Sequence, residues 1–131
     1  MTRYVIGPDV ADRLARDRAV IRHEHQLLAP TLLRSQLVDR LYQAVNRGEM
    51  TRLEAERRLD YVRALRLRLL GDRVLQRNAW DVAARLGWKD TYWAEYVALT
   101  RLQADALITL DDAVNAAARD VVTVASIDDL L

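Results

Sequence analysis

Five acidic residues stand at the ends of expected strands or the starts of expected helices, where they could act together on a metal ion. Carboxylates gathered in one place repel one another unless a cation neutralises them, and Mg²⁺ and Mn²⁺ take carboxylate oxygens as ligands. A cluster of three or four such groups is typical of a metal-dependent phosphodiesterase. The candidate metal ligands are Asp111, Asp9 and Asp112, and the candidate catalytic residues are Asp111, Glu95, Asp90 and Asp9.

Each of these acids also has an interpretation that involves no chemistry. Asp9, Asp90 and Asp111 stand where helices are expected to begin, and Asp is favoured there because it accepts hydrogen bonds from free backbone N–H groups. Glu95 and Asp112 are equally compatible with solvated helix positions. The residue types and their spacing therefore leave both interpretations open.

Other catalytic signatures are missing from the sequence. It has no Gly-x-Gly-x-x-Gly motif, no Gly-Lys-Ser/Thr phosphate loop and no cysteine. Its only serines are Ser35 and Ser126, and neither has a histidine near it in sequence. His23 and His25 lie in a polar stretch without a third ligand, which predicts a surface loop or helix end rather than a metal site.

Composition limits the remaining classes of function. With 131 residues, 51% of them apolar, the chain is expected to form one folded domain, residues 1–131. The net charge of +1 argues against a general polyanion binder. No stretch approaches the length of a membrane span or the apolar region of a signal peptide, so a cytoplasmic protein without membrane contact is expected.

The elements that would position the acids follow from hydrophobic periodicity and from helix-capping residues. Strands are expected at residues 4–6, 106–109 and 121–124, and the alternating run 65–69 is either a strand or the end of a helix. Helices are expected at 9–18, 30–46, 51–65, 72–86, 90–102 and 111–118, with Pro30 in the first turn of the second. Strands alternating with helices predict an α/β fold with a parallel sheet, whose ligands bind beyond the carboxyl ends of the strands.

The order of these motifs resembles the PIN domain, and within it the VapC toxins of bacterial toxin–antitoxin pairs. The resemblance spans essentially the whole chain and rests on four segments: Tyr-Val-Ile-Gly-Pro-Asp-Val at 4–10, Leu-Ala-Pro-Thr-Leu-Leu-Arg-Ser-Gln at 28–36, Trp-Ala-Glu-Tyr-Val-Ala-Leu at 93–99 and Ala-Leu-Ile-Thr-Leu-Asp at 106–111. It implies a PIN-like single domain with a mostly parallel sheet of four or five strands flanked by helices. It also implies a Mg²⁺-dependent endoribonuclease that forms a homodimer and is inhibited by an antitoxin, whose C-terminal segment wraps around it.

The site that the resemblance implies departs from the family pattern. The family has four acids, and their positions correspond here to Gly7, Gln36, Trp93 and Asp111, of which only the last is acidic. The leading hypothesis is therefore a degenerate PIN domain, catalytically impaired or inactive, that binds an antitoxin, a PIN relative or RNA. The alternative is an active ribonuclease that uses Mg²⁺ or Mn²⁺ on Asp111 with the displaced carboxylates of Asp9, Asp90 and Glu95.

Two further interpretations concern ligands other than a metal ion. Tyr92 and Trp93 could form a stacking platform for an unpaired base, with buried aromatic packing as the alternative. The doubly wound fold could also bind a phosphate or nucleotide, although only the analogy of fold supports this.

Overall fold

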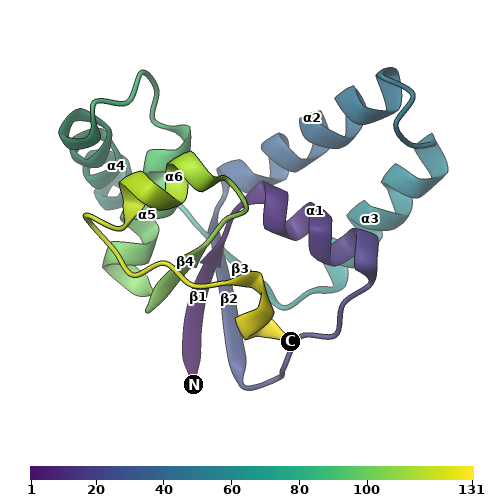
Figure 1. Cartoon of the computed structure of the whole chain (residues 1–131), viewed down its shortest axis with the longest axis horizontal. Coiled ribbons are helices and arrows are strands. Elements are labelled where there is room, and N and C mark those ends of the chain that lie inside the picture. Colours follow the sequence, from purple (N-terminus) through teal and green to yellow (C-terminus); the bar gives the residue numbers. More distant parts are fainter.

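The computed structural model describes residues 1–131 and contains four strands that form one parallel sheet with helices around it (Figure 1). The strand order is β3-β2-β1-β4, and every pairing is parallel, so all four carboxyl ends lie at one edge of the sheet. This confirms the expected α/β class. The strands are β1 (Thr2–Ile6), β2 (His25–Pro30), β3 (Leu67–Leu70) and β4 (Ala106–Ile108).

Six α-helices and a final 3₁₀ turn connect and cover the strands. In Figure 1, α4, α5 and α6 lie to the left of the strands, and α1, α2 and α3 lie to the right. None of these helices is long and apolar enough to cross a membrane. The helices are α1 (Pro8–Asp17), α2 (Leu32–Asn46), α3 (Arg52–Ala64), α4 (Arg73–Leu86), α5 (Tyr92–Gln103) and α6 (Asp112–Ala118), followed by η1 (Ile127–Leu130).

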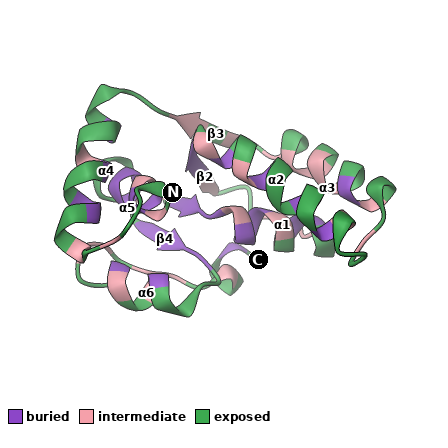
Figure 2. Cartoon of the chain, turned by 90° about the horizontal axis from the view of Figure 1, so that it is seen from above, coloured by how far each residue is buried: buried purple, intermediate pink, exposed green.

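The hydrophobic core surrounds the central strands. Val5 and Ile6 of β1 and Leu107 and Ile108 of β4 are completely buried. Figure 2 shows β2 and β4 largely buried, β3 only partly buried, and the outer faces of the helices exposed. A parallel sheet covered on both faces needs continuous apolar strands, which explains these β-branched and leucine runs. The helix α5 packs on β1, β2 and β4, so its first turns are fixed against the strand ends.

Several helix starts form as the capping residues predict. Thr51 accepts a hydrogen bond from the backbone N–H of Glu54, Asp72 from that of Leu75, and Asp111 from that of Val114. Each bond satisfies a backbone donor that has no partner within its own helix.

The structure differs from the expected elements in three places. The strand β2 was not expected, because His25-Gln26-Leu27-Leu28-Ala29-Pro30 contains no β-branched residue. Pro30 is the last residue of that strand and not part of a helix, and the following N–H, from Thr31, donates to the carbonyl oxygen of Leu70. The expected strand at 121–124 is reduced to a single bridge between Leu107 and Val124.

His25 also differs from its expected place in a surface loop or helix end. It is the first residue of β2, and its ring packs edge-on against Tyr4, with ring centroids 5.2 Å apart. Both ring nitrogens are buried without a hydrogen-bond partner. His23, by contrast, is exposed just before the strand.

Candidate functional site

A polar cleft of about 710 Å³ lies where the carboxyl ends of β1 and β4 meet the helices. Its walls come from the start of α1, from α2 and α3, from the first turn of α5, and from the turn between β4 and α6. The sequence-predicted residues on its walls are Asp9, Gln36, Trp93 and Asp111. Asp90, Glu95 and Asp112 are not on its walls.

At the end of β1, the ring of Trp93 occupies the space above Gly7. A Cβ atom placed on Gly7 would lie 2.6 Å from Cη2 of Trp93 and 2.5 Å from Oδ1 of Asp9, distances at which neighbouring atoms must move. Trp93 is half-buried, so it both packs against the strand end and borders the cleft. Gly7 and Trp93 are thus complementary in size, since any larger side chain at position 7 requires the indole to move.

Gln36 is held at the cleft by the same helix that carries Trp93. The hydroxyl of Tyr96, one turn after Trp93 on α5, donates a hydrogen bond to Oε1 of Gln36 at 2.6 Å. The rings of Trp93 and Tyr96 are tilted against each other, with centroids 5.1 Å apart. Burial raises the pKa of Tyr96, and the nearby charges of Asp9 and Glu95 raise it further, so the phenol remains a donor.

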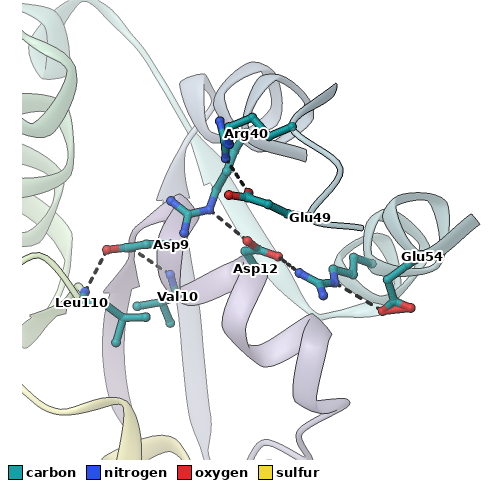
Figure 3. A network of polar contacts seen from close by, with 9 residues as sticks. Asp9, Val10, Asp12, Arg40, Glu49, Glu54 and Leu110 are labelled. Atoms are coloured by element: carbon teal, nitrogen blue, oxygen red, sulfur yellow. Dashed lines mark hydrogen bonds and ion pairs between the residues drawn. The ribbon is translucent and has the colours of Figure 1, made fainter. Parts of the chain in front are cut away.

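Asp9 is buried and joins two strand ends. Its Oδ1 accepts from the backbone N–H of Val10, and its Oδ2 accepts from the hydroxyl of Thr109 and the N–H of Leu110, each at 2.8 Å. Figure 3 shows the contacts with Val10 and Leu110. The side chain is therefore not a helix N-cap, because Gly7 occupies that position and the carboxylate points to the turn after β4. Three donors on one carboxylate stabilise its charge without a cation.

The other predicted acids have separate environments. Asp111 is exposed and accepts a hydrogen bond from Val114 N–H as the N-cap of α6, and Asp112 is exposed beside it. Asp90 is exposed and accepts from the N–H of Tyr92 at the start of α5. Glu95 is half-buried on α5, and burial raises its pKa.

The opposite wall of the cleft holds an ion-pair network, of which the sequence indicates only one contact. Asp12 of α1 accepts from Arg40 of α2 at 2.9 Å and from Arg58 of α3 at 2.8 Å, and Arg58 also contacts Glu54 (Figure 3). Arg58 is only 12% exposed; burial opposes its charge, but the hydrogen bonds to Asp12 and Glu54 raise its pKa overall. Only the contact between Glu54 and Arg58 follows from helical spacing, because Asp12 is 46 residues from Arg58.

The residues at the strand ends do not fit a divalent metal ion held by several carboxylates. Nowhere in the chain do three His, Cys, Asp or Glu side chains lie close enough together to hold one. Asp111 borders the cleft and Asp9 lies at its base, but Asp9 is already occupied by three neutral donors and Asp12 by two arginines.

Comparison with known proteins gives matches of structure but not of sequence. No family model matches the chain, and no curated protein is found to be similar to it. The structure superposes on PAE2754 from Pyrobaculum aerophilum with a TM-score of 0.78 and 20% identity, covering 98% of this chain and 91% of that one. It superposes on a chain of VapBC2 from Rickettsia felis, solved bound to a DNA fragment from its promoter, with a TM-score of 0.69. The fold is PIN-like. That second match has 7% identity and covers 95% of this chain and 98% of the other. At these identities, the likeness concerns the PIN-like fold and not the role of any residue.

Proposed function

We propose that this PIN-like protein is related to the VapC toxins but has lost most of its acidic metal site. In this proposal it is a catalytically impaired or inactive nuclease homologue that acts by binding. Its binding partners are an antitoxin protein, a PIN relative or RNA, and it forms a homodimer. The resemblance of the sequence to VapC toxins and the structural likeness to VapBC2 support this assignment.

The packing of Trp93 on Gly7 is the observation that carries the proposal. In the family pattern both positions would be acidic. Here the indole ring of Trp93 fills the space next to Gly7. At the third replaced position, the amide oxygen of Gln36 accepts a hydrogen bond from the hydroxyl of Tyr96. Of the four acids in the family pattern, only Asp111 would remain to bind a Mg²⁺ or Mn²⁺ ion at this place. One carboxylate supplies too few ligands unless substrate phosphates add others. Two-metal chemistry would need still more carboxylates.

An apolar groove between α2, α3 and β3 supports the proposal of a protein partner. It has a volume of about 490 Å³, and eight of its ten lining residues are hydrophobic, with Arg34 and Arg63 as the other two. Apolar side chains next to acidic ones would complement this surface, so the antitoxin segment is expected to combine leucine-like residues with Asp or Glu.

An RNA cleavage assay tests the proposal. Purified wild type, Trp93→Asp and Asp111→Asn would be incubated with total RNA in Mg²⁺ or Mn²⁺, with Asp112→Asn as a matched control beside the cleft. We expect intact RNA with wild type, Asp111→Asn and Asp112→Asn, and cleavage gained in Trp93→Asp. Metal-dependent cleavage by wild type that is abolished in Asp111→Asn but kept in Asp112→Asn would replace the proposal with the active-ribonuclease alternative.

A further inference from the structure

Trp80 on the outer face of α4 is the most exposed aromatic residue of the chain that borders a pocket. Its exposed fraction is 72%, whereas Trp88 and Trp93 are half-buried. It borders a shallow pocket of about 450 Å³ together with Gln76, Arg77 and Asp81. Figures 1 and 2 place α4 at the opposite end of the molecule from α3, and this pocket shares no residue with the polar cleft.

The polar side chains around Trp80 have no partners within the protein. Arg77 and Asp81 are four residues apart on one helix, a spacing that permits an ion pair, yet neither forms an ion pair or a side-chain hydrogen bond, and neither does Gln76. Elsewhere the chain forms eight ion pairs, including the two that join Asp12 to Arg40 and Arg58. A lone exposed tryptophan needs no explanation, but one surrounded by unpaired donors and acceptors in a pocket can recognise a polar aromatic ligand.

We propose that this pocket binds an unpaired nucleotide of single-stranded RNA. The base stacks on the Trp80 indole, because base–aromatic stacking tolerates any base and is effective only where the strand is unpaired. Side chains on a helix lean toward its N-terminus, so the indole lies over the turn that carries Arg77. The guanidinium of Arg77 then contacts the adjacent phosphate, and Arg73, seven residues before Trp80 and nearly on the same side of the helix, extends the basic track.

A second copy of this chain is the competing occupant, and the polar composition of the pocket disfavours it. Only one of the four pocket residues is hydrophobic, whereas the centre of a protein interface is enriched in apolar side chains. Arg73 and Arg77 precede the indole on α4, and Asp81 follows it. Phosphates complement those arginines, so a nucleic-acid strand fits this face better.

The inference rests on the proposed function only in taking RNA as the ligand, and it does not depend on the state of the polar cleft. Cleavage by wild-type protein would overturn the proposed function and leave this pocket untouched. Conversely, a Trp80→Ala variant that binds RNA as well as wild type would overturn this inference and leave the proposed function standing.

Fluorescence anisotropy with a short labelled poly(rA) strand, at low and moderate salt, tests the pocket. We expect Trp80→Ala to weaken binding about 10-fold or more, and Trp80→Phe to retain part of the affinity. Arg77→Glu should weaken binding and make it less dependent on salt. Arg85→Glu, the same charge change on an exposed position of α4 outside the pocket, is the matched control and should have a smaller effect. A duplex RNA of equal length should lose the dependence on Trp80.

Three binding results would overturn the inference. They are no binding of poly(rA) by wild type at low salt, equal affinity in wild type and Trp80→Ala, and equal losses in Arg77→Glu and Arg85→Glu. Light scattering tests whether a second copy of this chain occupies the pocket. A dimer of wild type that becomes a monomer in Trp80→Ala would assign the pocket to self-association. Circular dichroism of each variant confirms that it is folded, which the exposure of Trp80 leads us to expect.

Discussion

Asp9 and Asp12 lie three residues apart on α1, and different kinds of groups stabilise their charges. Asp9 is 8% exposed and accepts only from neutral groups, which belong to its own helix and to the turn after β4. Asp12 is bound by two cations, Arg40 and Arg58, which belong to α2 and α3. One carboxylate therefore joins two strand ends, and the other joins three helices.

The contrast shows how a cleft can contain acids and still have few carboxylates free for a cation. Backbone N–H groups and a hydroxyl stabilise the first charge, while guanidinium groups compensate the second. The three replaced positions, Gly7, Gln36 and Trp93, carry no charge at all. Asp111 remains at the rim, where it caps α6. If the cleft has lost its metal site, Asp9 and Asp12 stabilise the fold instead of binding a cation, which stability measurements can test.

The largest effect is expected for Asp9→Ala, because it leaves Thr109 and two backbone N–H groups without their acceptor. We expect the free energy of unfolding to fall by about 3 kcal/mol, since hydrogen bonds to a buried charge are among the stronger ones. Asp111→Ala is the matched control, losing one exposed cap bond and about 1 kcal/mol. Urea denaturation measures both. If Asp9→Ala cost no more than Asp111→Ala, Asp9 would not be the structural link described above.

A smaller loss, about 2 kcal/mol, is expected for Arg58→Ala, which leaves Asp12 and Glu54 without their shared cation in a mostly buried setting. The comparison is Arg52→Ala, which removes the exposed pair with Glu56 on the same helix and should cost less than about 0.5 kcal/mol. The same urea measurement applies. Equal losses in the two variants would mean that the network on this wall is no stronger than a surface ion pair.

Gly7→Ala is expected to cost about 1.5 kcal/mol, because the new methyl group meets the Trp93 ring and Asp9. In the double variant with Trp93→Ala, part of this cost should disappear, giving a coupling of about 1 kcal/mol. Gly7→Ala combined with the remote Trp80→Ala should be additive. Additive losses for Gly7 and Trp93 as well would contradict their complementary packing.

The smallest effect concerns Glu95, whose pKa is raised by burial. A raised pKa in the folded protein means that protonated Glu95 adds stability at low pH, and that this contribution is lost as the pH rises through the folded value. Glu95→Gln should therefore have a higher Tm than wild type at pH 7 and the same Tm below about pH 4. A difference that is equal at both pH values, followed by calorimetry, would rule out a titrating Glu95.

The sequence predicted the elements whose signals are local. The strand Tyr4–Ile6, the caps at Thr51, Asp72 and Asp111, and the parallel α/β class all follow from neighbouring residues, and the structure confirms them. The strand β2 could not be predicted in the same way, because Pro30 suggested a helix start and only its position between β1 and β3 makes it a strand.

The location of the candidate site could be predicted from the sequence, but the contacts within it could not. The carboxyl ends of the strands were the expected location, and the cleft lies there. The contacts of Asp9 with Thr109 and of Asp12 with Arg58 join residues 100 and 46 positions apart, so no spacing rule reveals them. Capping was the natural alternative for Asp9, and its real role, joining β1 to the turn after β4, required the fold.

Calorimetric titration with Mn²⁺ tests the central claim most directly. Wild type would be compared with the triple variant Gly7→Asp, Gln36→Glu and Trp93→Asp, which returns an acid to each replaced position, and with that variant carrying Asp111→Asn. We predict no saturable binding to wild type, and binding to the triple variant that Asp111→Asn weakens. Saturable binding of Mn²⁺ to wild type, abolished by Asp111→Asn, would contradict the account and show that the cleft still holds a metal.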